Sequence, residues 1–192
     1  RLYESGDITY MRTDSVNLNA AAAEALVALA RQKFGDQYAT GRRLYQTTSK
    51  TAQEAHEAIR PTDSRRLAAG HGPVEKKLYD LIWRRAIASQ MADARLAHTK
   101  ITAKASDETV PLFAARGQRV IFDGWLVADP AARGEDTELP SVRQGELLKL
   151  EKIKSEGKAT TPPDRYTEAG LVRELETRGL GRPSTYATII KH

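Results

Sequence analysis

The spacing of apolar residues changes near residue 94, and this change constrains the fold more than any other feature of the sequence. After a short extended start, the chain up to about residue 93 carries apolar side chains three and four positions apart, as amphipathic helices do. From 94 to about 165 apolar and polar residues alternate, which is typical of strands, and helical spacing returns from 166. We therefore expect an α+β chain with three regions, residues 1–93, 94–165 and 166–192.

Two helices are expected in the first sixty residues. Asn19 is a favourable N-cap for the alanine-rich run 20–33, and Gly35 can end that helix. A capping-box pattern that starts at Thr51 indicates a shorter helix, which would run through Ile59.

A longer helix is expected from Pro73 to about Met91, because proline is favoured in the first turn of a helix. Trp83 in this helix and Trp125 further on are expected to belong to the core rather than to stack on bases. The apolar residues at helical spacing predict one buried stripe, made by Val74, Leu78, Leu81, Ile82 and Ala86.

Strands are expected in the second region and helices in the third. Residues 99–103 alternate as a strand does, 109–127 predict two strands around Arg116, and 145–153 predict another. In the third region, a first helix should end at Gly179 and a second should open at Pro183.

Composition excludes several classes of protein. The chain has no cysteine, which rules out disulfides, thiolate zinc sites and a cysteine nucleophile. It has no apolar run near the ~20 residues of a membrane helix, and its net charge of +5 is compatible with a polyanionic partner. The chain begins with arginine and its last helical segment stops midway, so we expect a piece of a longer protein.

Tyr10 and Arg12 are the first candidate site residues. Residues two apart in an extended segment face the same side, so these two side chains would project together. A guanidinium can stabilise a phenolate and hold a phosphate through two hydrogen bonds, which suits attack of a tyrosine on a phosphodiester. The alternative is a half-buried tyrosine on a strand, followed by a turn at Asp14 and Ser15.

His56 and Arg60 are the second candidate pair, four positions apart in the expected short helix and hence on one face. They could contact a phosphate backbone, the arginine as a fixed charge and the histidine as a titratable donor. The alternative is a surface helix on which Glu57 and Arg60 form a solvated ion pair. Neither His56 nor His71 has the neighbours that a metal site needs, so no metal site is expected in this chain.

The third candidate is the segment 178–186, which combines two glycines, an arginine and hydroxyl groups at the expected start of the last helix. Helix N-terminal amides attract anions, so Arg182 and Thr185 could help to hold a phosphate, although the spacing is not that of a P-loop. The alternative is a helix–turn–helix connection with a glycine C-cap and hydroxyl N-caps.

The three candidate segments occur together in one known family. ITYMRTDS (8–15), AHEAIRPT (55–62) and GLGRPSTYATII (179–190) resemble, in order and spacing, the signature segments of bacterial DNA topoisomerase I, the type IA family. LYDLIWRRAIASQM (78–91) and RVIFDGWLV (119–127) also resemble stretches of that family. Five segments in order make the resemblance specific.

The resemblance implies roles for the candidate residues. Tyr10 is expected to be the nucleophile that forms a 5′-phosphotyrosyl ester with one DNA strand, and Arg12 to position the scissile phosphate. Because the ester conserves the phosphodiester energy, the strand could rejoin without ATP after another strand has passed, relaxing negative supercoils. Four residues are expected near the single-stranded DNA or in a segment that contacts it: His56, Arg60, Arg182 and Thr185.

The resemblance also implies an architecture. Residues 1–93 would be a helical, winged-helix-like tyrosine domain, 94–165 part of an antiparallel β arch with an exposed edge, and 166–192 the truncated start of a helical DNA-binding domain. Mg²⁺ would bind to acidic residues of a Toprim domain that this chain lacks, so the chain alone is expected to be inactive. A cytoplasmic, nucleoid-associated bacterial protein is implied, monomeric and without membrane contact.

One alternative to catalysis stays open, and a second is disfavoured. One is a single-stranded DNA-binding or gate-forming module without chemistry, in which Tyr10 only stacks or packs. The other is a purely structural β/α module, which gives no reason for the motifs around Tyr10 and Arg182 to occur together.

Overall fold

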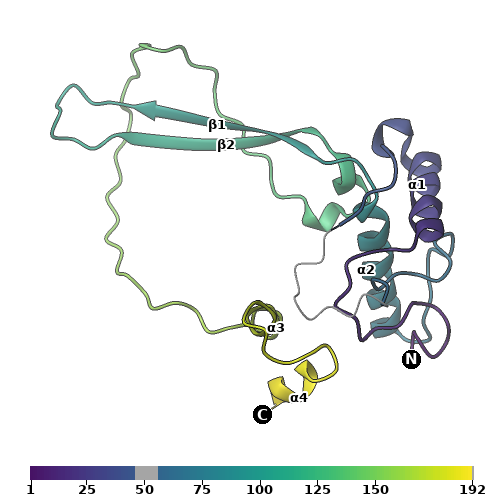
Figure 1. Ribbon diagram of the computed structural model, residues 1–192. Helices are drawn as coiled ribbons and strands as arrows, with labels where there is room; N and C mark the ends of the chain where they lie inside the picture. Colours follow the sequence, from purple (N-terminus) through teal and green to yellow (C-terminus); the bar gives the residue numbers. More distant parts are fainter. Residues whose placement is uncertain (46–55, 192) are drawn as a thin grey trace.

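The structure, a computed structural model, describes residues 1–45 and 56–191. Within them, helices and one two-stranded antiparallel sheet are combined (Figure 1), so the expected α+β class is confirmed. The elements, in chain order, are α1 (Ala20–Phe34), η1 (Asp36–Tyr38), α2 (Pro73–Ser89), β1 (Arg95–Ala103), β2 (Phe113–Phe122), η2 (Gly124–Val127), η3 (Pro130–Ala132), α3 (Glu168–Thr177) and α4 (Tyr186–Lys191).

Helix α1 begins and ends where its local sequence predicts. The side-chain oxygen of Asn19 accepts the backbone N–H of Ala22 at 2.8 Å and so satisfies one free donor of the first turn. Gly35 follows the helix with a φ of 104°, a conformation that favours glycine, and its N–H bonds the carbonyl of Arg31. The predicted N-cap and stop are both confirmed.

Helix α2 starts at Pro73 as predicted, but it buries a different face. Tyr79, Trp83 and Ile87 are buried, whereas most of the predicted stripe is exposed, with Val74 at 79% and Leu78 at 47%. The aromatic face is buried because its polar atoms find partners there: the Tyr79 hydroxyl donates to Arg66 O and the Trp83 indole N–H to Ser64 O, each at 2.7 Å. The prediction that Trp83 belongs to the core is confirmed, and the prediction of the stripe is wrong for Val74, Leu78 and Leu81.

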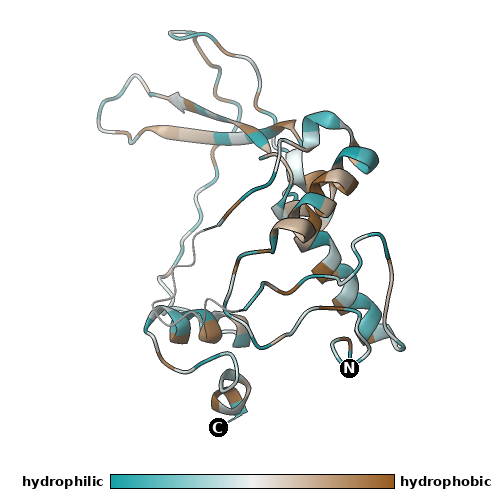
Figure 2. Ribbon diagram, turned by 45° about the vertical axis from the view of Figure 1, so that its right-hand side comes forward, coloured by the Kyte–Doolittle hydropathy of each residue, from teal (hydrophilic) through white to brown (hydrophobic). Residues whose placement is uncertain are grey.

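The core lies between α1, α2 and the N-terminal segment. Figure 2 shows apolar residues gathered where the two helices face each other. Its buried members include Leu26, Val27 and Ala30 from α1 together with Leu2 and Ile8 from the first residues. The segment before Tyr10 is therefore fixed to the helices by hydrophobic packing, which stabilises one side of the site described below.

Strands β1 and β2 form a hairpin in which Thr99 lies opposite Gly117. The prediction of two strands within 109–127 is wrong, because β2 runs without interruption through Arg116 and Gly117. A Cβ on Gly117 would lie 2.4 Å from the carbonyl oxygen of Thr137, so glycine is required here by the segment that bridges to β2 at Gln118, not by a turn.

The other predicted strands of the second region do not form. Trp125 lies in η2, a short 3-10 helix, because Gly124 turns the chain with a φ of 52°. Residues 145–153 are irregular, and Leu147, Leu148 and Leu150 are exposed by 98%, 58% and 70%. A strand needs a hydrogen-bonded neighbour, and the described part of the chain offers none to this segment.

The hairpin extends away from α1 and α2, and the chain after it returns as a long irregular segment to α3 and α4 (Figure 1). The base of the hairpin is joined to α2 by Asp129, whose carboxylate lies 3.0 Å from Arg84. Helix α3 is followed by Gly179, with a φ of 68°, as predicted, and α4 begins at Tyr186, three residues after Pro183. None of the described helices is both long and apolar enough to cross a bilayer.

Candidate functional site

Tyr10 stands at the edge of the packed N-terminal segment. Ile8, two positions earlier, is 5% exposed and forms an isolated antiparallel bridge with Pro61, while the backbone N–H of Thr9 donates to Arg60 O at 2.9 Å. Tyr10 itself is 39% exposed and lies outside any strand. The backbone up to Thr9 is thus held firmly, and the phenol ring projects from its end.

The Tyr10 ring lies between two other rings. Tyr3 meets it edge-on with centroids 5.2 Å apart, and the His56 imidazole is tilted against it at 5.8 Å. Ring contacts at these separations are favourable and limit the orientations that the phenol can take. Tyr3 was not singled out from the sequence, because its place beside Tyr10 depends on the turn of residues 1–6.

Four of the six predicted site residues line one hollow of about 440 Å³. The hollow is bounded by three segments that are distant in the sequence, and all its lining residues are Tyr10, Arg12, Asp14, His56, Arg182, Pro183 and Ser184. The prediction that Tyr10 and Arg12 project to the same side is confirmed by their common position in this lining.

The hollow is positively charged. Arg12 and Arg182 contribute two guanidinium groups against the single carboxylate of Asp14, and His56 adds a group that can donate a hydrogen bond. Arg12 forms no ion pair with any residue in 1–45 or 56–191, so its charge is not neutralised by a described carboxylate. Such a site, beside an exposed hydroxyl, attracts a phosphate group.

The segment that carries His56 is not helical. Residues 56–60 are irregular, so the prediction that His56 and Arg60 share a helical face is wrong; the start of that expected helix, residues 51–55, lies outside the described residues. Hydrogen bonds to other segments replace the helical ones. The backbone N–H of Ala58 donates to Asn17 O at 2.8 Å, and the backbone N–H of Thr9 donates to Arg60 O. His56 reaches Tyr10 because of this extended pairing.

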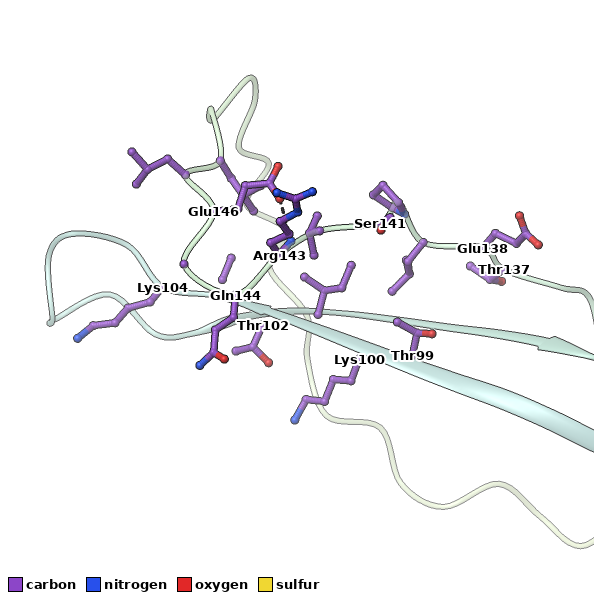
Figure 3. A pocket seen from close by; sticks show the side chains of 18 of the residues that line it. Thr99, Lys100, Thr102, Lys104, Thr137, Glu138, Ser141, Arg143, Gln144 and Glu146 are labelled. Carbon is purple, nitrogen blue, oxygen red and sulfur yellow. Dashed lines mark hydrogen bonds between the residues drawn. The ribbon is translucent and has the colours of Figure 1, made fainter.

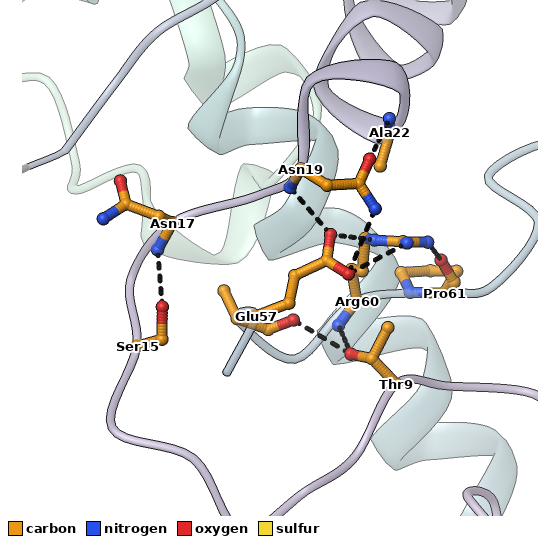
Figure 4. Close-up of polar contacts among 9 residues, drawn as sticks. Thr9, Ser15, Asn17, Asn19, Ala22, Glu57, Arg60 and Pro61 are labelled. Carbon is orange, nitrogen blue, oxygen red and sulfur yellow. Dashed lines mark hydrogen bonds and ion pairs between the residues drawn. The ribbon is translucent and has the colours of Figure 1, made fainter. Parts of the chain in front are cut away.

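Arg60 does not line the hollow. Its Nε and Nη2 donate to the two carboxylate oxygens of Glu57 at 2.7 and 3.1 Å, and its Nη1 donates to Pro61 O at 2.8 Å (Figure 4). The side chains of Arg60 and Glu57 are only 14% and 23% exposed, so this pair is less solvated than the surface pair considered from the sequence.

Glu57 joins this pair to the start of α1. Its carboxylate also accepts the backbone N–H and the side-chain amide of Asn19, at 2.9 and 3.3 Å (Figure 4). Burial raises the pKa of Glu57, but the hydrogen bonds from Arg60 and Asn19 and the charge of Arg60 outweigh it and leave the pKa below its ordinary value. No local pattern predicts this contact, because Asn19 is distant in the chain.

Arg182 is held in the turn before α4. The Thr185 hydroxyl accepts the Arg182 N–H at 2.8 Å, and the Thr185 N–H donates to Arg182 O at 2.8 Å. The Thr185 hydroxyl thus bonds back to a residue before the helix and not to an N–H of its first turn, as an N-cap would. Thr185 does not line the hollow, whereas Arg182 does. Burial raises the pKa of Tyr186, and the charges of Glu176 and Asp14 raise it further.

A larger hollow, of about 1120 Å³, lies between the hairpin and residues 137–148 (Figure 3). Its lining residues carry both signs of charge, with Lys100, Lys104, Arg119 and Arg143 against Glu138 and Glu146. None of the predicted site residues lines it.

The sequence model of the DNA topoisomerase family matches residues 1–192. The chain belongs to the DNA topoisomerase family. The similarity to the type IA enzymes expected from the sequence is thereby confirmed.

Related DNA topoisomerases are similar over nearly the whole chain. DNA topoisomerase 1 of Vibrio cholerae is 46% identical over 194 residues, which cover 99% of this chain and 22% of the relative. That of Streptomyces coelicolor is 48% identical over 204 residues, which cover 99% of the chain and 21% of the relative. The chain thus spans about 22% of the length of these curated relatives.

The fold is shared with a solved topoisomerase. The structure of full-length topoisomerase I from Thermotoga maritima matches 96% of this chain and 30% of its own with a TM-score of 0.81, at 37% identity. The arrangement of helices and hairpin is therefore that of part of a topoisomerase I.

The described residues of this topoisomerase segment do not fit a metal ion. No three histidine, aspartate or glutamate side chains gather within residues 1–45 and 56–191 as a metal site would require. Asp14 is the single carboxylate of the hollow, and a Mg²⁺ site usually needs more oxygen ligands. No chemical step at Tyr10 is therefore assigned to a metal held by these residues.

Proposed function

We propose that this chain is the part of a DNA topoisomerase that supplies the nucleophile, and that Tyr10 attacks a phosphodiester of single-stranded DNA. The observation that carries the proposal is the common hollow of Tyr10, Arg12, His56 and Arg182. It brings an exposed phenol together with two guanidinium groups and an imidazole, from three segments, as attack on a phosphate requires. Membership of the DNA topoisomerase family gives independent support.

In the proposed reaction the Tyr10 oxygen forms a bond to phosphorus while the bond from phosphorus to the 3′ oxygen breaks. The phenol loses its proton, the departing 3′ oxygen gains one, and the 5′ phosphate stays esterified to Tyr10. Arg12 and Arg182 stabilise the charge on the phosphoryl oxygens. His56 lies 5.8 Å from Tyr10 between ring centroids and would contact the same phosphate. Reversal of these steps rejoins the strand without ATP, after another strand has passed.

The remaining parts of the proposal follow the family. Residues 1–93 would form a winged-helix-like tyrosine domain, 94–165 part of a β arch, and 166–192 the start of a helical DNA-binding domain. Arg60 would act near the DNA through Glu57, and Thr185 through Arg182, the residues to which they are hydrogen-bonded. Mg²⁺ would be bound by a Toprim domain elsewhere in the polypeptide, so that the 192-residue chain alone should not relax supercoiled DNA. The protein would act as a monomer in the bacterial cytoplasm, at the nucleoid.

The test is Tyr10→Phe in the full-length enzyme that contains these residues. Phenylalanine keeps the ring contacts with Tyr3 and His56 and removes only the hydroxyl. We expect the variant to bind a labelled single-stranded oligonucleotide as the wild type does and to form no covalent protein–DNA adduct on a denaturing gel. An adduct of wild-type intensity would reject the proposal.

The same experiment decides the second candidate, a gate or DNA-binding module without chemistry. The edge-on contact of Tyr10 with Tyr3 favours it, since such a pair can serve packing alone. In that case Tyr10→Phe would leave relaxation of supercoiled DNA largely intact.

A further inference from the structure

The residue next to the proposed nucleophile is bonded to the segment that carries His56. The Thr9 hydroxyl donates to Ala58 O at 2.9 Å and accepts the backbone N–H of Arg60 at 3.0 Å (Figure 4). The backbone N–H of Thr9 donates to Arg60 O at 2.9 Å. Three hydrogen bonds thus join the position before Tyr10 to positions two and four residues after His56.

The far side of the His56 segment is fixed independently. Glu57 is tied to Asn19 and Arg60, and the N–H of Ala58 donates to Asn17 O at 2.8 Å. These contacts hold the segment against the start of α1. They do not determine how far Tyr10 lies from His56, because none of them involves residues 8–10.

We propose that Thr9 is a positioning residue, whose hydroxyl sets the separation between Tyr10 and His56 in the topoisomerase reaction. This inference rests on the proposed function of Tyr10. The hydroxyl suits the task because one small group both donates to Ala58 O and accepts from Arg60 N, while a hydrocarbon side chain of the same size can do neither. Its loss would leave two partly buried backbone groups without these partners, and only the backbone hydrogen bond from Thr9 N–H to Arg60 O would still join this position to the segment of His56.

The experiment compares Thr9→Val with Thr9→Ser in the full-length enzyme. Valine keeps the shape and removes both hydrogen bonds of the hydroxyl, whereas serine keeps the hydroxyl. Because a misplacement of about 1 Å can slow a reaction about 100-fold, we expect Thr9→Val to lower the single-turnover rate of adduct formation by about 10- to 100-fold. Thr9→Ser should stay within about threefold of the wild type, and the Kd for the oligonucleotide should change by less than about threefold in both.

Thr62→Val is the matched control for a purely structural effect. The Thr62 hydroxyl joins the same two segments, since its oxygen lies 2.5 Å from Gly6 O and 3.2 Å from Asp7 O, but it does so farther along the chain from Tyr10 and His56. We expect Thr62→Val to lower the melting temperature about as much as Thr9→Val does. Its rate of adduct formation, measured well below that temperature, should be that of the wild type.

The outcomes separate the role of Thr9 from that of Tyr10. If adduct formation depends on Tyr10 but Thr9→Val keeps the wild-type rate, or slows it no more than Thr62→Val, the positioning role of Thr9 is overturned while the proposed function stands. If the wild type forms no adduct, or the adduct persists in Tyr10→Phe, the proposed function is overturned and the assignment of Thr9 to the reaction with it. A slow Thr9→Val with normal Thr9→Ser and Thr62→Val supports the proposal.

Discussion

Glu57→Gln is the substitution whose effect on stability follows most directly from the structure. The carboxylate accepts four hydrogen bonds, at 2.9 and 3.3 Å from Asn19 and at 2.7 and 3.1 Å from Arg60. Glutamine has one oxygen and one NH₂ group, so two of the four donors would face another donor.

The number and charge of these hydrogen bonds set the loss in free energy of unfolding. Each lost hydrogen bond to a charged group is worth about 1.5–3 kcal/mol at most, and the 23% exposure of Glu57 allows water to replace part of it. We therefore expect the free energy of unfolding to fall by about 2 kcal/mol at pH 7. For a chain of this length that corresponds to a decrease in Tm of about 4–8 °C, measured by circular dichroism.

The pH dependence of this difference gives a second measurement. Because the pKa of Glu57 is lower in the folded chain than its ordinary value of 4.5, its contribution is present above that pH and is lost as the pH falls through the folded pKa. The difference between wild type and Glu57→Gln should thus shrink in acid. Glu108→Gln, at a pair with Lys104 in which the glutamate is 84% exposed, is the control and should change stability by less than about 0.5 kcal/mol. A Glu57→Gln effect no larger than this control, or one that does not shrink in acid, would refute the reasoning.

Two further substitutions test the junction between the helices and the hairpin. Asp129→Asn should lower the free energy of unfolding in urea by about 1.5 kcal/mol, because the 7%-exposed carboxylate loses its charge-assisted bond to Arg84 at 3.0 Å while Arg84 keeps its second partner, Asp80, at 2.9 Å; no measurable change would contradict this. Gly124→Ala should cost about 2–3 kcal/mol, since its Cβ would lie 2.5 Å from the backbone of Ala94. Gly145→Ala also has a positive φ, of 81°, but no neighbour within 4 Å, so it should cost about 1 kcal/mol, and equal costs at the two glycines would argue against the close approach.

Local sequence predicted those elements of the fold that depend on neighbouring residues. The cap at Asn19, the stop at Gly35 and the start at Pro73 need only a side chain or a backbone conformation within a few positions, and all three are confirmed. The buried face of α2 was predicted wrongly because Tyr79 and Trp83 find their hydrogen-bond partners outside the helix, in the segment before it, 13 and 19 residues away.

The site residues likewise divide into those that local spacing placed correctly and those that depend on distant contacts. Spacing in an extended segment was enough to place Tyr10 and Arg12 on one side, and both line the hollow. The approach of His56 could not be derived from spacing, because it depends on the hydrogen bonds of Thr9 and not on a helix. Arg182 was associated with Tyr10 through the family resemblance alone, since no local rule brings the two ends of the chain together.

The side of the hollow formed by Tyr10 and the side formed by Arg182 differ in how much buried core supports them. The wall of Tyr10 rests on a core with fully buried side chains such as Leu26, whereas α3 and α4, which flank Arg182, contain no buried residue among those described. Moving the Arg182 wall away from Tyr10 would therefore expose little apolar surface, while moving the Tyr10 wall would disrupt the core. Amide hydrogen exchange should accordingly be fast in α3 and α4 and slow in α1. In the proposed function, the DNA strand would then enter between a rigid side and a mobile side of the hollow.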